Sequence, residues 1–235
     1  MYFCYVLVEI IDIIDESHRV KRFVLKSIVG QYFQFEPGQF IQIFHPNLPE
    51  FQNTRSYSIS SLSDGNTLEL CIALNENGIF TPWLFGLSVG HQLEISEPQG
   101  QFIFKEEYAQ FPCVFICTGT GIAPFLSMIN KALSISNQPV HLVFGNRKFE
   151  DVLYREMLEN LSLENEKFSF YPVFSQESSA EFKGYVHSVY QDILRDIEGE
   201  VRIFVCGWKD MCLETRQKLK EMGYNRKQYF FEQYD

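Results

Sequence analysis

The hydrophobic pattern of the sequence changes near residues 105–111, and this change constrains the fold more than any other feature. Before it, short runs of β-branched and aromatic residues are punctuated by turn sequences such as Glu36-Pro37-Gly38. Short strands at this spacing predict an antiparallel β-barrel. After it, apolar runs alternate with segments of helical period, which predicts a doubly wound parallel sheet in an α/β domain. We therefore expect two domains, residues 1–107 and 108–235.

Each expected element has a range within this outline. The strands of the first domain are expected at Tyr2–Val8, Val20–Leu25, Gln39–Phe44, Tyr57–Ser60, Leu68–Leu74 and Gln92–Ser96. A short helix over Thr81–Phe85 is expected among them, with Pro82 in its first turn. The second domain is expected to alternate strands Cys113–Cys117, Val140–Phe144, Phe168–Val173 and Val201–Cys206 with helices Phe125–Leu133, Asp151–Leu161, Val186–Asp196 and Lys209–Met222.

Composition limits the class of protein. The chain is 46% hydrophobic and 21% charged, as folded globular proteins are, and its formal charge of −10 argues against nucleic acid or an anionic membrane as a partner. No apolar run is long enough to span a bilayer. The first residues lack the basic start and cleavage site of a signal peptide. Six cysteines without disulfide spacing favour reduced thiols, so we expect a cytoplasmic location.

The first chemically informative motif is the run Arg-Ser-Tyr-Ser at residues 55–58. The guanidinium of Arg55 matches the geometry of pyrophosphate oxygens. Tyr57 offers a flat face for an isoalloxazine ring, and Ser58 offers a hydroxyl that can hydrogen-bond flavin N5. The run therefore indicates a flavin site. The alternative is an edge strand with an exposed arginine.

A second motif, Thr-Gly-Thr-Gly-Ile-Ala-Pro at residues 118–124, lies between an expected strand and an expected helix. Backbone N–H groups at such a helix start can bind a phosphate. The motif lacks the third glycine of the dinucleotide fingerprint, and a plain strand–helix turn is the alternative. Residues 78–81 open the expected short helix in a similar way, although a hairpin turn is the commoner explanation. Cys206-Gly207 follows at a strand end, where open α/β sheets bind ligands.

Taken in order, these motifs resemble the ferredoxin–NADP+ reductase family, most closely its compact bacterial branch, over nearly the whole chain. The matching segments are Arg55–Ser58, Gly78–Thr81, Pro98-x-Gly100, Gly119–Pro124, Gly145–Arg147, Asp151, Tyr154, Cys206–Met211 and Glu232-x-Tyr234. The resemblance implies an FAD-binding β-barrel domain followed by a nicotinamide-nucleotide domain.

The resemblance also implies roles for individual residues. FAD contacts are implied at Arg55, Ser56, Tyr57, Ser58, Cys71, Gly78, Ile79, Phe80, Thr81, Thr120 and Tyr234. Contacts to NAD(P) are implied at Thr118, Gly119, Gly121, Pro124, Arg147, Ser175, Cys206, Gly207 and Met211. The hydride-transfer path is expected to be lined by Ser58, Cys206 and Glu232. No metal site is expected. The closing residues 231–235 form a chain end, and such ends normally fray.

One departure from the family bears on the choice between NADPH and NADH. NADP-binding members carry arginines at the positions that read Gln176 and Tyr185 here. Losing a charge-assisted phosphate contact costs about 1.5–3 kcal/mol. Arg147 remains, and Lys183 lies close in sequence. We therefore expect a weak or reversed preference for NADPH.

The expected activity is transfer of electrons between NAD(P)H and ferredoxin or flavodoxin through FAD, with hydride delivered to flavin N5 and electrons leaving singly. One alternative is an NADH-dependent reductase for an oxygenase or a metal chelate. Another is a non-catalytic electron-transfer subunit, as in two-subunit dihydroorotate dehydrogenases. That resemblance calls for a C-terminal cysteine cluster, which this sequence lacks. A monomer is expected.

Overall fold

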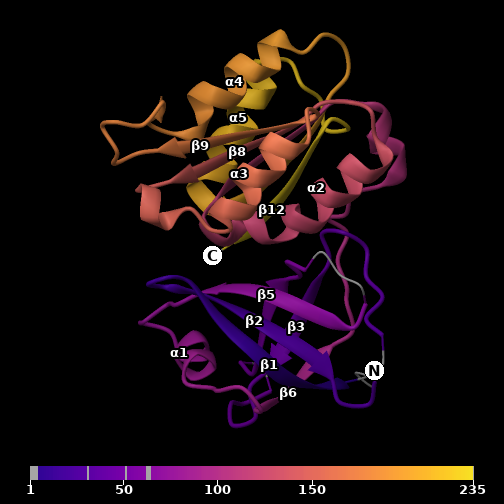
Figure 1. Cartoon of the computed structure of the whole chain (residues 1–235), viewed down its shortest axis with the longest axis vertical. Helices are drawn as coiled ribbons and strands as arrows, with labels where there is room; N and C mark the ends of the chain where they lie inside the picture. The colour runs from indigo at the N-terminus through magenta and orange to yellow at the C-terminus, as the bar shows by residue number, and fades with distance from the viewer. Residues whose placement is uncertain (1–4, 31, 51, 62–64, 235) are drawn as a thin grey trace. The chain divides into compact units, whose positions relative to one another are not determined.

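The computed structural model describes residues 5–30, 32–50, 52–61 and 65–234. The expected strand start at Tyr2 and the last of the closing residues, Asp235, lie outside the described residues. The chain divides into two compact units, and the main division falls between Ile103 and Phe104. Each unit is built around its own six-stranded sheet (Figure 1).

The first unit is an antiparallel β-barrel, as expected. Its sheet has the order β4-β3-β6-β1-β2-β5. An isolated bridge between Ile59 and Leu70 joins the two edge strands, and the Ser60 N–H donates to the Glu69 carbonyl at 2.8 Å, so the sheet closes on itself. The elements are β1 (Tyr5–Ser17), β2 (Val20–Ser27), β3 (Phe40–Phe44), β4 (Thr54–Ser58), β5 (Thr67–Ala73), α1 (Phe80–Phe85) and β6 (Gln92–Ser96).

Alternation along the strands builds the core of the barrel. In β5, Leu68, Leu70 and Ile72 are buried, whereas Thr67 and Glu69 are only partly buried. Because successive side chains of a strand point to opposite faces, this pattern directs one face inward. The three apolar residues join a single hydrophobic cluster of the unit.

The second unit is a parallel sheet of order β10-β9-β8-β7-β11-β12. Because β7 lies between β8 and β11, the chain reverses its direction across the sheet at β7. The carboxyl ends of β7 and β11 therefore form the topological switch point, where open sheets of this kind bind ligands. The strands are β7 (Cys113–Thr118), β8 (Val140–Asn146), β9 (Phe168–Phe174), β10 (Phe182–Lys183), β11 (Arg202–Trp208) and β12 (Tyr229–Tyr234).

Helices cover both faces of this sheet, so it is doubly wound (Figure 1). Val114 and Val205 share a hydrophobic cluster with residues of α4 and α5. On the opposite face, Phe115 stacks on Phe204 with ring centroids 5.0 Å apart and meets Phe125 of α2 at the same distance. The helices are α2 (Ala123–Ile135), α3 (Arg155–Glu164), α4 (Val186–Asp196) and α5 (Lys209–Glu221), and three short 3-10 turns are η1 (Glu106–Gln110), η2 (Gly119–Ile122) and η3 (Phe149–Asp151).

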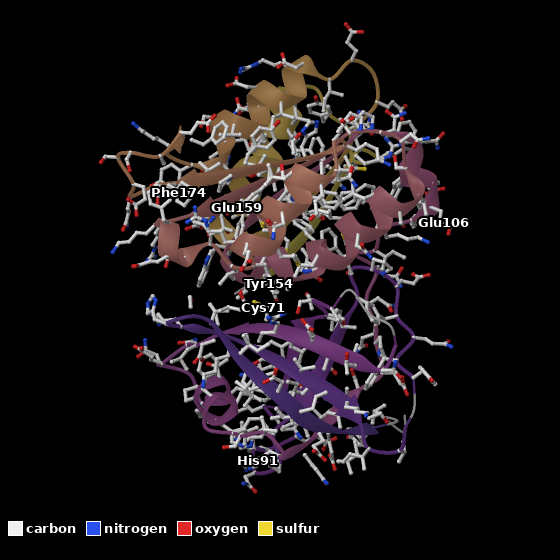
Figure 2. The ribbon with its side chains drawn as sticks, in the orientation of Figure 1. Cys71, His91, Glu106, Tyr154, Glu159 and Phe174 are labelled. Atoms are coloured by element: carbon white, nitrogen blue, oxygen red, sulfur yellow. The ribbon has the colours of Figure 1, made fainter. Side chains whose placement is uncertain are left out.

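Four expectations were wrong in detail. The strand expected to end at Val8 runs to Ser17 as β1, because it pairs with β2 from Val8 to Ser17. The strand expected over Tyr57–Ser60 ends at Ser58, because β4 pairs with β3 only as far as the Phe40–Ser58 pair. The helix expected over Asp151–Leu161, α3, begins at Arg155, after Tyr154 adopts φ +54° (labelled in Figure 2). The tail expected to fray instead forms β12, which pairs in parallel with β11. In the part of the chain that the structure describes, no helix has the length and apolar character needed to cross a bilayer.

Candidate functional site

In the first unit, Arg55 is an exposed cation on β4. Its Nη1 donates to the Thr54 carbonyl at 2.6 Å and to the Gln52 carbonyl at 3.4 Å. The guanidinium also lies over the Phe80 ring, 5.6 Å from its centroid. Within the described residues, no carboxylate forms a salt bridge with Arg55. Its charge therefore remains able to pair with an anion such as a pyrophosphate.

An aromatic group adjoins this arginine. The Tyr57 ring lies 6.3 Å from the Phe80 ring, and Phe80 packs on Trp83 with centroids 5.4 Å apart. His45 completes the group, 4.2 Å from Trp83. Burial raises the pKa of Tyr57 well above its ordinary value of 10.0, although the Arg55 charge opposes this. Tyr57 is therefore a neutral, apolar ring face at physiological pH.

The loop before α1 is held together by Thr81. Its hydroxyl accepts from the Asn75 N–H at 2.8 Å and donates to the Asn75 carbonyl at 3.3 Å. The Gly78 N–H donates to the same carbonyl at 3.0 Å. The N-cap residue Ile79 is exposed, and no side chain caps the helix or places an acid in its first turn. The Thr81 hydroxyl thus shapes the turn, and the N–H groups of Ile79 and Phe80 are not capped by a side chain.

The serines of the run lie on the other face of β4. Ser56 pairs with Gln42 and is exposed, whereas Ser58 pairs with Phe40 and is buried. Alternation along the strand separates both serines from the face of Arg55 and Tyr57. Cys71 is buried on β5 (Figure 2). The contact of Ser58 with a flavin nitrogen therefore stays a prediction.

In the second unit, two glycines let the end of β7 and the turn after it lie close against β11 at the switch point. A side chain on Gly121 would collide with the carbonyl oxygen of Cys206, and one on Gly207 would collide with the hydroxyl of Thr118. Gly207 also has φ +145° and lies against Met211. Only glycine allows this close approach.

The sequence Gly119–Ile122 forms the 3-10 turn η2 and leads directly into α2. Pro124 lies in the first turn of α2, as expected, and that turn carries no acid and no capping side chain. Gly119 has φ +54° and Thr120 follows it, half-buried. Successive N–H groups in such a left-handed to right-handed turn form an anion-binding concavity. This local geometry suits a phosphate of a dinucleotide.

Cys206, Glu232 and Tyr234 lie side by side at the end of the same sheet. Cys206 pairs in register with Glu232, and Trp208 pairs with Tyr234. Burial raises the pKa of the Cys206 thiol well above its ordinary value, the Glu232 charge raises it further, and a Tyr234 hydrogen bond opposes both. Cys206 therefore presents a neutral thiol at physiological pH.

The ends of β8 and β9 form a separate part of the site. The Ser175 N–H donates to the Asn146 carbonyl at 3.0 Å, and the Gln176 N–H donates to the Arg147 carbonyl at 2.9 Å. Arg147 is exposed, and no salt bridge to it occurs among the described residues. These hydrogen bonds bring Arg147, Ser175 and Gln176 together, and their contact with a nucleotide stays a prediction.

The same loops contain a carboxylate that the sequence analysis did not single out. Glu177 Oε1 accepts a hydrogen bond from the Phe149 N–H at 3.3 Å. It follows Gln176 directly, and Tyr185, at the second position where the family has arginine, is 74% exposed. The sequence could have pointed to Glu177, because it directly follows Gln176, one of the two positions at which the family has arginine. A carboxylate near this edge disfavours a 2′-phosphate electrostatically.

Comparison with known proteins accounts for both units. Residues 7–104 match the model of the oxidoreductase FAD-binding domain, and residues 115–217 match that of the oxidoreductase NAD-binding domain. A ferredoxin–NADP reductase B of Sorangium cellulosum (strain So ce56) is 31% identical over 217 residues, which cover 88% of each chain. The chain belongs to the ferredoxin–NADP reductase family. FAD is therefore its cofactor and a nicotinamide nucleotide its second ligand.

Other members of this family are built into longer chains. The toluate 1,2-dioxygenase electron transfer component of Pseudomonas putida is 28% identical over 213 residues, which cover 89% of this chain but 62% of that protein. A ferredoxin NADP+ reductase of Neisseria gonorrhoeae, solved with bound FAD and NADP, matches with a TM-score of 0.83 at 21% identity and covers 97% of this chain and 98% of its own. That match shows the shared fold.

Proposed function

We propose that this family member transfers electrons from NAD(P)H through FAD to a small one-electron carrier, ferredoxin or flavodoxin. The observation that carries the proposal is the presence of two anion-binding arrangements in one chain. In the first unit, Arg55, which forms no salt bridge with any described residue, lies beside an aromatic group. In the second, an uncapped helix start lies at the switch point of the sheet.

Each arrangement has a task. Arg55 holds the FAD pyrophosphate, and Tyr57 supports the ring with its neutral face. The N–H groups around Gly119 and Gly121 hold the pyrophosphate of the nicotinamide nucleotide. FAD supplies the redox chemistry, taking up hydride and releasing electrons singly. The buried Cys206 thiol stays neutral and so places no negative charge beside the transfer path, where an anionic thiolate would repel hydride.

The coenzyme proposed for this chain is NADH, or both nucleotides without strong preference. Gln176 and Tyr185 supply no charge, and Glu177 adds a negative one nearby. Arg147 at the joined ends of β8 and β9 is exposed, and the adjacent Lys148 pairs with Glu150 at 3.6 Å. Lys183 ends β10. One exposed arginine supports a 2′-phosphate less well than a pair does.

A second candidate function is reduction of an oxygenase or of its ferredoxin. The similarity to the electron transfer component of toluate 1,2-dioxygenase favours it. The loss of the two arginines favours it as well, since it removes a reason for NADPH dependence. The two candidates share the flavin chemistry and differ in the acceptor.

The test begins with purified protein, which is expected to hold a single FAD per chain. Stopped-flow mixing with NADH and with NADPH measures flavin reduction. The reduced protein is then mixed separately with a bacterial ferredoxin, a flavodoxin and a Rieske-type ferredoxin. Rapid oxidation by either of the first two supports the main proposal, and rapid oxidation by the third alone supports the second candidate. A colourless protein that takes up neither FAD nor FMN would contradict both candidate functions.

A further inference from the structure

Trp208 is an exposed indole at the carboxyl end of β11. It is 63% exposed, and it is the last residue of that strand. Single exposed apolar side chains are common on proteins, so exposure alone assigns no role. Its position is more informative, because β11 borders the switch point of the parallel sheet.

The backbone of Trp208 is fixed against the strand that leads into η2. Its N–H donates to the Thr118 hydroxyl at 3.4 Å. The preceding residue, Gly207, is pressed against the same hydroxyl. The backbone that carries the indole is therefore held by a strand and by a hydrogen bond to Thr118.

The indole nitrogen lies beside the proposed phosphate site. Trp208 Nε1 is 3.6 Å from the point where a Cβ on Gly119 would be. Gly119 is the first residue of η2 and has φ +54°, so a side chain there would be strained and would also meet the indole. An indole N–H only donates hydrogen bonds. Within the described residues no acceptor for it and no ring partner for the indole occur.

We propose that Trp208 is a coenzyme-contact residue, whose indole N–H donates a hydrogen bond to the pyrophosphate of NAD(P)H and whose ring covers the nucleotide there. The proposal rests on the proposed function. It adds a side-chain donor to a site otherwise made of backbone N–H groups. A Trp ring also offers a large contact area at little cost in conformational entropy.

Fluorescence provides the direct test, because the chain contains two tryptophans, Trp83 and Trp208. The oxidised FAD-loaded protein is titrated with NAD+, and indole emission is followed beside calorimetric binding. Saturable quenching is expected in the wild type, with the calorimetric Kd. Trp208→Phe is expected to abolish the quenching while NAD+ still binds, since its remaining indole is Trp83.

Kinetics test the contact independently. Trp208→Phe keeps an aromatic ring and removes the donor, so KM for NADH is expected to rise about three- to tenfold with kcat changed less than about twofold. Trp208→Ala should raise KM further. Leu213→Ala, an exposed apolar residue of α5, is the matched control and should leave KM unchanged.

The outcomes separate this inference from the proposed function. Saturation by NAD+ with unchanged wild-type emission, or a wild-type KM in Trp208→Ala, would overturn the role of Trp208 while the proposed function stands. If neither calorimetry nor flavin reduction shows any interaction with NAD+ or NADH, the proposed function fails and this inference fails with it.

Discussion

The two units build their candidate sites from different parts of the chain. In the barrel, side chains form the site: Arg55 is an exposed cation, and Tyr57 and Phe80 are rings beside it. In the parallel sheet, backbone forms the site, because Gly121 of η2 and Gly207 of β11 allow the chain after β7 to lie close against β11. Substitutions in the barrel site should therefore change ligand binding with little effect on stability. Substitutions at the glycines of the parallel-sheet site should also destabilise that unit.

The largest expected effect is on stability and belongs to the second unit. Gly121→Ala forces a methyl group against the Cys206 carbonyl, so we expect the free energy of unfolding to fall by about 2–4 kcal/mol. Urea denaturation measures the change. Gly86→Ala is the control, because a methyl group there meets its nearest atom, the Trp83 carbonyl oxygen, at an ordinary 3.4 Å. A fully stable Gly121→Ala protein would break the distinction between the units.

The next effect is on cofactor affinity and belongs to the first unit. Arg55→Ala removes a charge-assisted contact, so FAD affinity should fall by about 1.5–3 kcal/mol, while stability of the FAD-free protein changes by less than about 0.5 kcal/mol. Flavin fluorescence gives the Kd, and thermal unfolding gives the stability. Arg19→Ala, another exposed arginine of the barrel, should leave both unchanged. A large loss of stability in Arg55→Ala would contradict a separable site.

The comparison of the two units has one expected exception. In the second unit, the preference between NADH and NADPH is expected to depend on side chains and not on backbone. Gln176→Arg with Tyr185→Arg should shift preference toward NADPH by about 1–3 kcal/mol, mostly through KM, because the 2′-phosphate is far from the reacting ring. The ratio of kcat/KM for the two nucleotides measures it, and the shift should fade at high ionic strength. Gln176→Met with Tyr185→Met is the uncharged control. A wild type that already favours NADPH a hundredfold would show that Arg147 and Lys183 suffice.

The smallest effect is on the pH dependence of stability. Burial raises the pKa of the Cys117 thiol well above its ordinary value of 9.0. Above that pH the unfolded chain loses this proton and the folded chain keeps it, so stability falls as pH rises. Cys117→Ala should reduce this loss by up to about 1.4 kcal/mol per pH unit above pH 9. Urea denaturation at several pH values between 8 and 10 measures the slope, and an unchanged slope would mean that Cys117 ionises in the folded protein.

Much of the fold could be predicted because its periodicities are local. The alternation in β5 and the apolar run of β7 both lie within short windows of sequence. The strand β12 could not be predicted in this way. Its residues Glu232 and Gln233 are those of a polar chain end, and only pairing with β11 makes them a strand. The two-residue strand β10 is too short to leave a pattern.

The parts of the candidate site that form a contiguous motif could be predicted from the sequence. The parts that depend on contacts between distant segments could not. The glycines at 119 and 121 are visible in sequence, whereas the contact of Gly121 with Cys206 joins segments far apart in the chain. The contact between the His45 and Trp83 rings likewise joins distant residues. The placement of Ser58 opposite Tyr57 follows from strand alternation once β4 is known.

Anaerobic stopped-flow reduction of the FAD-loaded protein is the most direct test of the family chemistry in this chain. NADH at increasing concentration should bleach the flavin absorbance near 450 nm with a saturating rate, and NADPH should do so with similar or lower efficiency. Saturation would show a bound nucleotide complex before hydride transfer. A flavin that stays oxidised with both nucleotides, in protein that retains FAD and folds normally, would contradict the assignment of the second unit as a nicotinamide-nucleotide site.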